Sequence, residues 1–486
     1  MAIRPMPSLG GGGWRPGGGR GPAPAGRGVG LALTTTAMAG FVVACARDDQ
    51  DGEEGLGASV VSLFSDMQSN PEDGSTGPAD AGRSPSLADV VAMADTPKSE
   101  ASGAEIDPPA PNTSSAVVTT LATLTGIGCS ADHFIGDCDV QTEIERICCS
   151  CSSVMSPGSL FCYTPEGIPQ ETLALDFRPD QLAFLPANAE GDLRLASTWH
   201  NPVSDQWGAA TVNMTTGAIA TFPFPPAPDK NGGNFFPNQA KGITTIGEEI
   251  FVAAGNVFFT TSPATYEDGL LARLSPDDGT FSIAMIPTGG LNPTTLDRVE
   301  MSGGTELAVA NTGAFDLAKN DFVGGNLARV ADPYQSAQVT QQTAGGVGVS
   351  GEGTIIGHDW LLPAGNMGGN FCSFSLINPN TPPLCSQSAT DGKPHFLTVA
   401  KTFPLGGSIY VMGCDYNAQA CHWWQVTSTG FPLLRTFHDI VTTPSTGVAD
   451  IVWLPQQPPE DANILGHLDL SVGPDIRRLT VREGTE

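Results

Sequence analysis

The feature that most constrains the fold is a unit of about 47 to 57 residues that recurs between residues 171 and 486. Six short segments of apolar and small residues mark it, and their centres are separated by 57, 57, 47, 55 and 54 positions. Such a period is typical of proteins built from repeated supersecondary units. The marks are centred on Leu195, Val252, Val309, Ile356, Val411 and Leu465.

A second pattern follows the first with the same period. Gly269-Leu-Leu-Ala-Arg-Leu274 returns 56 residues later as Gly325-Asn-Leu-Ala-Arg-Val330. The turn sequence Asp277-Asp278-Gly279-Thr280 comes next in one repeat, and Asn213-Met-Thr-Thr-Gly217 occupies the comparable place in another. Because Asp-Gly favours tight hairpins, each unit predicts four antiparallel strands joined by turns.

A single four-stranded sheet would leave both of its faces in water. Packing several sheets around an axis buries the faces between neighbours, which is the principle of the β-propeller. The composition agrees, because 59 Gly and 40 Pro with only 15% charged residues suit short strands and turns. We expect an all-β domain over residues 171–486 with about six blades, and a pair of β-sandwiches is the alternative.

Three of the marks resemble the Tyr-Val-Thr-Asn type of bacterial β-propeller repeat. They are Phe251-Val-Ala-Ala-Gly-Asn256, Ala308-Val-Ala-Asn-Thr-Gly313 and Tyr410-Val-Met-Gly-Cys-Asp415. The likeness is clearest over residues 235–335. Because repeats of this type occur in secreted surface-layer and periplasmic proteins, the resemblance implies a propeller outside the cytoplasm.

The N-terminus has the pattern of an export signal over residues 1–44. Four arginines and no acid occur before residue 29, and sixteen uncharged residues, Val29 to Ala44, follow. A short apolar run behind positive charge is typical of a secretory signal and is short for a membrane span.

The signal ends in Val42-Val43-Ala44-Cys45, which resembles the lipobox of bacterial lipoproteins. The resemblance implies that the Cys45 thiol takes a diacylglyceryl group and anchors the chain in a membrane. Ala46 at the next position points to the outer membrane by analogy with enterobacterial sorting. The alternatives are an ordinary signal peptide or a short membrane helix.

Residues 45–128 predict a disordered acidic tether. Between Arg47 and Gly128 there are fourteen acids and three bases, a local charge of 3 − 14 = −11, and much of the rest is Pro, Ser, Gly and Ala. Such a segment cannot bury enough apolar surface to offset the entropy lost on ordering.

A cysteine-rich segment, residues 129–170, follows the tether, and it predicts a small disulfide-stapled module placed before the propeller. Without Cys45, ten cysteines remain, an even number that favours disulfides in an oxidising compartment. A zinc site near His133 is the weaker alternative, because no second pair repeats the two-residue spacing of Cys148 and Cys151. The six cysteines are Cys129, Cys138, Cys148, Cys149, Cys151 and Cys162, and sequence cannot choose among their fifteen pairings.

Four further cysteines lie in two close pairs. Cys372 and Cys385 are thirteen residues apart, and Cys414 and Cys421 are seven apart. Each pair is close enough to staple a hairpin or loop, so we expect both as disulfides.

The candidates for chemistry are few. His358 and His467 end similar Ile-Ile-Gly-His and Ile-Leu-Gly-His segments, so they are candidates for facing one channel, with Asp359 and Asp469 beside them. The plainer interpretation is that two related strands end alike. The Trp423-Trp424 pair predicts core packing, and a ligand-binding surface is the alternative. No nucleophile-elbow, zinc-protease, phosphate-loop or EF-hand motif is present, and no catalytic or metal-binding residue is assigned.

The net charge of −29 argues against nucleic-acid binding, because 22 bases face 51 acids. We therefore expect a monomeric, lipid-anchored cell-envelope protein without a cofactor, whose propeller binds a protein, glycan or small ligand or serves as a scaffold. The alternative is a secreted propeller enzyme, such as a lyase, lactonase or glycan-active hydrolase, with its site at the mouth of the channel.

Overall fold

The computed structural model describes residues 118–483, apart from short gaps at 142–144, 154–155, 259–263, 278–279, 317–320, 344, 348–352, 365–369, 387–396, 416–419, 428–429, 442–446 and 457–462. The regular structure of these residues consists of 34 β-strands. In the part of the chain that is described, no helix is long and apolar enough to span a membrane.

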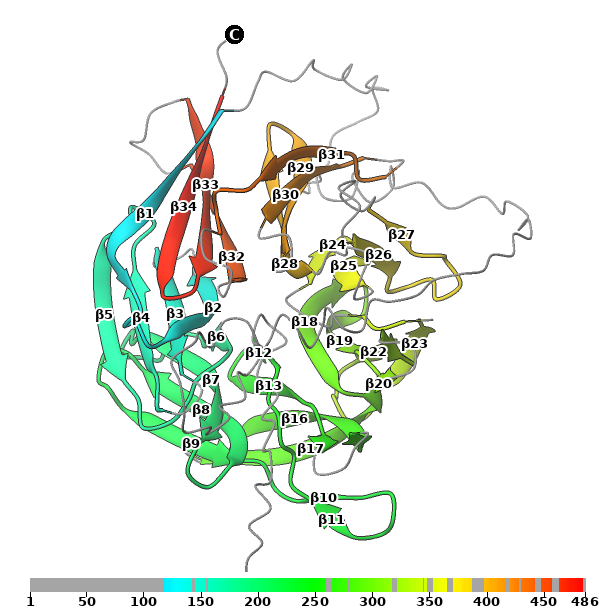
Figure 1. The fold of residues 1–486 in the computed structure, drawn as a ribbon. Helices are drawn as coiled ribbons and strands as arrows, with labels where there is room; N and C mark the ends of the chain where they lie inside the picture. The colour runs from blue at the N-terminus through cyan, green and yellow to red at the C-terminus, as the bar shows by residue number, and fades with distance from the viewer. Residues whose placement is uncertain are drawn as a thin grey trace, which may run out of the picture.

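The strands form seven four-stranded antiparallel sheets arranged around an axis, which is a seven-bladed β-propeller (Figure 1). From the inner to the outer strand, blade 1 consists of β2 (Phe134–Gln141), β3 (Arg146–Ser152), β4 (Ser159–Tyr163) and β5 (Pro169–Ala174). Blade 2 consists of β6 (Leu182–Phe184), β7 (Arg194–Asn201), β8 (Gln206–Asn213) and β9 (Ile219–Pro223). Blade 3 consists of β12 (Gly242–Ile246), β13 (Glu249–Ala254), β16 (Asp268–Asp277) and β17 (Thr280–Leu291).

The remaining blades repeat the pattern. Blade 4 consists of β18 (Pro293–Met301), β19 (Gly304–Asn311), β22 (Asn326–Val330) and β23 (Gln338–Gln342). Blade 5 consists of β24 (Thr354–Ile356), β25 (Asp359–Ala364), β26 (Asn370–Ser375) and β27 (Leu384–Cys385). Blade 6 consists of β28 (Leu397–Leu405), β29 (Ser408–Asp415), β30 (Ala420–Val426) and β31 (Leu433–Phe437). Blade 7 consists of β32 (Val448–Pro455), β33 (Ile464–Val472), β34 (Asp475–Arg482) and β1 (Val118–Gly128).

The second strand of a blade is covered on both faces by its neighbours. In β13, five of the six residues are buried, and in β19 the last five of eight are buried. Side chains of a strand alternate between its two faces, so small and branched residues such as Val252 and Ala253 pack into different clusters on opposite faces of one blade. This two-sided burial explains why the repeat marks are runs of apolar residues.

The expectation of about six blades was wrong, since the ring has seven. The additional blade is the cysteine-rich segment, which we had expected to form a separate module: β2 to β5 form blade 1 and pack between blades 7 and 2. The last eleven residues of the expected tether form β1, the outer strand of blade 7, and β1 pairs with β34 from Val118↔Arg482 to Gly128↔Asp475. The ring is therefore closed by strands from both ends of the described chain.

The repeat mark of blade 1 was missed because it consists largely of cysteine. In β3, residues 147–151 read Ile-Cys-Cys-Ser-Cys, and all of them are at most 2% exposed. They occupy the place that Ile-Phe-Val-Ala-Ala has in β13, because a cysteine packs as a small apolar residue.

The fourth mark lies on a different strand from the others. Leu195, Val252, Val309, Val411 and Leu465 belong to the second strands of their blades, whereas Ile356 ends the inner strand β24. The second strand of blade 5 is β25, which begins at Asp359. The irregular spacing of 47 residues therefore came from a misplaced mark and not from a shorter blade.

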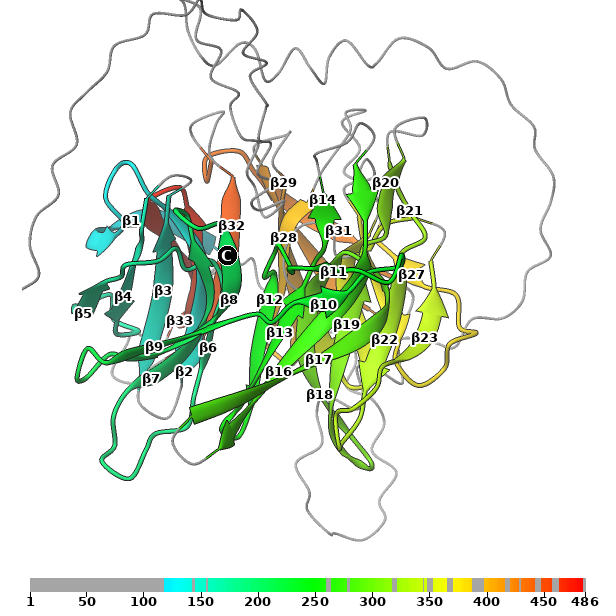
Figure 2. The same cartoon turned by 90° about the horizontal axis from the view of Figure 1, so that it is seen from below.

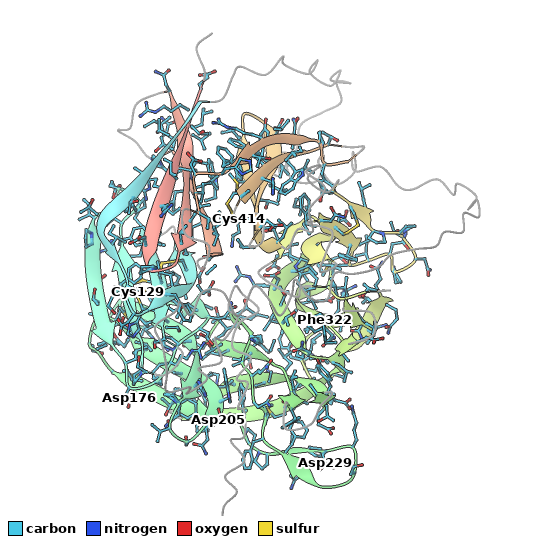
Figure 3. All side chains as sticks on the ribbon, in the orientation of Figure 1. Cys129, Asp176, Asp205, Asp229, Phe322 and Cys414 are labelled. Atoms are coloured by element: carbon cyan, nitrogen blue, oxygen red, sulfur yellow. A yellow bond between two sulfur atoms is a disulfide. The ribbon has the colours of Figure 1, made fainter. Side chains whose placement is uncertain are left out.

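The ten described cysteines pair into five disulfides. Cys129 bonds Cys151, Cys138 bonds Cys149, and Cys148 bonds Cys162 in blades 7 and 1. The expected pairs Cys372–Cys385 and Cys414–Cys421 are present in blades 5 and 6. Four of the five join residues that lie directly opposite each other on neighbouring strands. Cys129 and Cys414 are labelled in Figure 3.

One face of the ring carries the longer connections. In each blade the connection from the second to the third strand, and the connection from the fourth strand to the next blade, leave on the same side, which we call the loop face. Three small hairpins extend there from blades 2 to 4: β10 (Ala227–Pro228) with β11 (Asn234–Phe235), β14 (Val257–Phe258) with β15 (Thr265–Tyr266), and β20 (Ala314–Asp316) with β21 (Asp321–Val323). Figure 2 shows β14, β20 and β21 together on one side of the ring.

Candidate functional site

The two histidines singled out in the sequence are not in equivalent places. His358 lies in the turn between β24 and β25, on the face opposite the loop face, and is partly buried. His467 lies within β33, is 7% exposed and hydrogen bonds through Nδ1 with Thr480 Oγ1 at 3.0 Å. The premise of matching positions was therefore wrong. Asp469, on β33, pairs with Arg478 inside blade 7.

The two tryptophans are core residues. Trp424 is fully buried, and its ring lies 5.1 Å from Phe371 of blade 5. Trp423 is 4% exposed and packs against Phe403 and Phe437. The two rings point into opposite interfaces of blade 6, so the prediction of core packing is confirmed.

The loop face holds a group of charged side chains where the chain enters blade 2. Arg178 and His200 pair through their backbones, with Arg178 N donating to His200 O at 2.9 Å and the reverse bond at 3.1 Å. Gln181 O then accepts from Thr198 N at 3.0 Å, so Pro179 and Asp180 form a bulge opposite the single residue Trp199. Bulges often re-aim a side chain near a binding site.

Serine and threonine hydroxyls hold this bulge in place. The amides of Asp180 and Gln181 both donate to Thr198 Oγ1, at 3.0 and 2.9 Å. From blade 1, Ser150 Oγ donates to Asp180 O at 2.8 Å, and Ser152 Oγ donates to Pro179 O. The backbones approach so closely that a Cβ at Gly136 would lie 2.6 Å from Asp180 O. The bulge is therefore a fixed feature of the interface between blades 1 and 2.

Arg178 is a buried cation at this bulge. It is 1% exposed, its Nη2 donates to Asp180 Oδ1 at 3.1 Å, and its guanidinium lies 6.0 Å from the Phe134 ring centre. Ser152 Oγ also lies 3.2 Å from Asp180 Oδ1, so its one proton is shared between this oxygen and Pro179 O. The carboxylate of Asp180 is therefore shared between a cation and a hydroxyl and is fixed in direction.

Lys241 is a second cation, and the charges of Asp180 and Arg178 act on it. It immediately precedes β12, the inner strand of blade 3, and it is partly buried. Burial lowers the pKa of Lys241 from 10.5 to about 8, the Asp180 charge acts in the opposite direction, and Arg178 lowers it further. Within the described ranges no carboxylate oxygen lies within 4 Å of its ammonium group. We call Arg178, Asp180, His200 and Lys241 the bulge cluster.

His200 contributes an acceptor to the cluster. Its ring is 5% exposed, stacks on Trp207 at 4.0 Å, and hydrogen bonds through Nε2 with Asp205 Oδ1 at 3.0 Å. Burial lowers the pKa of His200, and so does Arg178, although Asp205 opposes them. In the neutral ring with Nε2 protonated, Nδ1 is an acceptor, and this buried atom has no hydrogen-bond partner in the described structure.

The second feature of the loop face is the group of three small hairpins. The first is shaped by Asp229, whose Oδ1 accepts from the amides of Asn231 and Gly233 at 2.7 and 2.8 Å, with Gly232 at a positive φ of 83° between them. The hairpin brings Phe235 and then Phe236 to the surface, and Phe236 is 64% exposed.

Direct contacts join the three hairpins. The Phe235 and Phe258 rings meet edge to face at 6.0 Å, and Lys230 Nζ donates to Tyr266 O at 3.1 Å. Tyr266 Oη accepts from the amide of Phe315 at 3.1 Å, and the Phe315 ring contacts Phe322 at 5.2 Å. We call this set the hairpin surface, made of Phe235, Phe236, Phe258, Tyr266 and Phe315. Figure 3 labels Asp229 and Phe322 at its two ends.

The two features are adjacent along the chain. Asn238, three residues before Lys241, makes two hydrogen bonds with the backbone of Val257, the first residue of β14. Its Nδ2 donates to Val257 O at 2.6 Å, and its Oδ1 accepts from Val257 N at 3.1 Å. The segment just before Lys241 therefore also holds the middle hairpin.

Sequence reasoning did not find these residues. A bulge and a buried lysine depend on contacts between blades, and no local pattern reports them. Two pairs of adjacent aromatic residues, Phe235-Phe236 and Phe258-Phe259, could have indicated the hairpin surface in the sequence. Cys45 lies outside the described residues. Among the described residues, no three His, Cys, Asp or Glu side chains are placed to hold a metal ion.

Searches against known proteins give no relative from which a role could be transferred. No family model matches the chain, and no curated protein matches it. The seven-bladed β-propeller, its five disulfides and the two features of its loop face are thus the basis for assigning a role.

Proposed function

We propose that this chain is an exported, lipid-anchored protein of the bacterial cell envelope whose propeller binds a ligand on the loop face of blades 2 to 4. The observation that carries the binding role is the hairpin surface, three insertions that interlock and leave Phe236 64% exposed. Exposed aromatic side chains on inserted loops are typical of interaction sites, because water is a poor solvent for them.

Export is supported by the cysteines. All ten that the structure describes are in disulfides, and a chain so rich in disulfides suits an oxidising compartment. The lipobox-like sequence at Cys45 then supplies the anchor, by its resemblance to bacterial lipoproteins. Mass spectrometry of the native N-terminus after membrane fractionation tests this part: an acylated fragment beginning at Cys45 is expected, and a soluble product cut elsewhere would exclude the anchor.

The binding role is tested on peptide and glycan arrays probed with the purified mature chain. We expect Phe236→Ser to reduce array binding at least tenfold. Ile377→Ser is the matched control, because Ile377 is 57% exposed on the opposite face, in the connection between β26 and β27, and its variant should bind normally. Equal binding by the native chain and the Phe236→Ser variant would contradict the role of the hairpin surface.

The bulge cluster is the observation that favours the alternative, a propeller enzyme, since the charge of Arg178 acts on both a histidine and a lysine whose pKa values burial lowers. The discriminating assay measures turnover of polyuronates and lactones. Product formation that disappears in both His200→Ala and Lys241→Met would establish the enzyme, and our account expects no turnover.

A further inference from the structure

The three hairpins of the hairpin surface carry an excess of acids among their aromatic residues. Residues 227–236, 257–268 and 314–323 contain five acids and two bases, a charge of 2 − 5 = −3. The acids are Asp229, Glu267, Asp268, Asp316 and Asp321, and the bases are Lys230 and Lys319.

Two of these carboxylates are each held in place through one oxygen. Asp229 Oδ1 accepts from two amides of its own turn, at 2.7 and 2.8 Å, and Glu267 Oε2 accepts from the amide of Lys230 in the same turn, at 3.3 Å. The ammonium group of Lys230 lies 3.4 Å from Asp268 Oδ1, and among the described side chains neither Asp229 nor Glu267 has a cation within 4 Å. We call Asp229 and Glu267 the hairpin carboxylates.

The hairpin carboxylates lie on the same hairpins as the aromatic side chains. Phe236 directly follows the first hairpin and is 64% exposed, and Tyr266, whose Oη accepts from the amide of Phe315 in the third hairpin, directly precedes Glu267. Fixed negative charge beside an exposed apolar side chain is complementary to a segment that has a basic side chain beside an apolar one.

We propose that the hairpin surface binds a peptide segment of a partner protein in which Lys or Arg stands next to apolar side chains. The apolar side chains pack on Phe236, and the basic groups pair with the hairpin carboxylates. This inference rests on the proposed binding role of the hairpin surface and names the kind of partner that it recognises.

Other occupants of this surface carry charge of the wrong sign. A second copy of the chain has a charge of −29, the segment from Arg47 to Gly128 has a charge of −11, and an anionic lipid surface is repelled in the same way.

The cations of the bulge cluster do not reverse this sign. Arg178 and Lys241 are offset by three carboxylates at the same bulge and its strands: Asp180 binds Arg178, Asp205 binds His200, and Asp137 accepts from the amide of Leu182.

The test uses the purified mature chain and two probes, acetyl-Lys-Leu-Phe-Lys-amide and its counterpart with Gln in place of both Lys. Binding is measured by calorimetry at pH 7, in about 20 mM and about 300 mM salt. Two partly exposed ion pairs predict that the Lys peptide binds about tenfold more tightly at low salt. Because salt screens exposed charges, this preference should fall below about threefold at high salt.

The double variant Asp229→Asn/Glu267→Gln keeps side-chain oxygens that can accept the same amide hydrogen bonds but removes both charges. In this variant the preference for the Lys peptide at low salt should fall below about twofold. Glu145→Gln/Glu190→Gln is the matched control, because it removes two exposed acids on the opposite face, between the first and second strands of blades 1 and 2. The control should keep the preference, and circular dichroism establishes that each variant is folded.

Equal binding of the two peptides by the native chain, no binding of either peptide, or an undiminished preference in Asp229→Asn/Glu267→Gln would overturn the proposal. Binding to phosphatidylglycerol vesicles that is lost in Phe236→Ser would overturn it in favour of an anionic membrane. Loss of array binding in Phe236→Ser together with equal binding of the two peptides would refute the preference for basic segments alone and leave the proposed binding role standing.

Discussion

The junction between the last blade and the first depends on a buried ion pair. Arg478 donates through Nε and Nη2 to the two oxygens of Asp469, each at 2.7 Å, and the side chains are 8% and 1% exposed. Tyr163 of blade 1 donates to Asp469 Oδ2 at 3.1 Å, and burial raises the pKa of Tyr163 well above its usual value, so this phenol stays a donor. Asp469 therefore joins strands from both ends of the ring.

We expect Asp469→Asn to lower the free energy of unfolding by about 3 to 5 kcal/mol, because it removes the negative charge that balances a buried guanidinium. The assay is urea denaturation followed by tryptophan fluorescence at pH 7. Glu248→Gln is the matched control. Glu248 pairs with Arg194 at a similar separation of 2.9 Å, but its side chain is 43% exposed. This substitution should therefore lower the free energy of unfolding by at most about 1 kcal/mol. If Asp469→Asn costs no more than Glu248→Gln, the account of this junction is wrong.

Three further predictions concern single elements. Because the pKa of Lys241 is lowered in the folded chain, the unfolded chain binds more protons between pH 8 and 10.5. The free energy of unfolding should therefore rise across that window by on the order of 2 kcal/mol relative to Lys241→Met, measured by denaturation at pH 7 to 10. The same dependence of this free energy on pH in both proteins would contradict the prediction. Replacing both Cys148 and Cys162 by alanine should cost about 3 kcal/mol, because their disulfide closes a loop with a separation of 14 residues. Trp424→Ala should cost about 3 to 5 kcal/mol in the same assay, since the fully buried ring fills the interface with Phe371.

Much of the architecture could be predicted from the sequence because the second strand of each blade is buried on both faces. That burial forces runs such as Ile250 to Ala254, and the Leu-Ala-Arg pattern then marks the third strand in β16 and β22. The prediction missed blade 1 because Cys148, Cys149 and Cys151 fill the place of valine and alanine.

Closure of the ring could not be predicted locally. β1 pairs with β34, at the other end of the described chain, and four threonines, Thr119, Thr120, Thr123 and Thr125, interrupt its apolar residues. The bulge cluster was missed for a similar reason, since Arg178 and Lys241 are brought together by the packing of blades 2 and 3. The sequence does not distinguish a lysine that becomes partly buried on folding from one that stays on the surface.

The central structural claim is one closed ring of seven blades, because the position of the loop face and of both its features depends on it. The pairing of β1 with β34 tests it directly, since Thr120 and Thr480 are directly opposite each other. Residues so placed have Cα atoms about 4.5 to 5.5 Å apart, within the range of a disulfide. In the control pair, Thr120 and Arg482, the second residue is two positions further along β34.

The measurement is non-reducing peptide mass spectrometry of the double variants after mild oxidation. The account predicts a cross-linked peptide pair in Thr120→Cys/Thr480→Cys and little of it in Thr120→Cys/Arg482→Cys. Absence of the cross-link in the first variant, or equal yields in the two, would contradict a ring closed by the two ends of the chain.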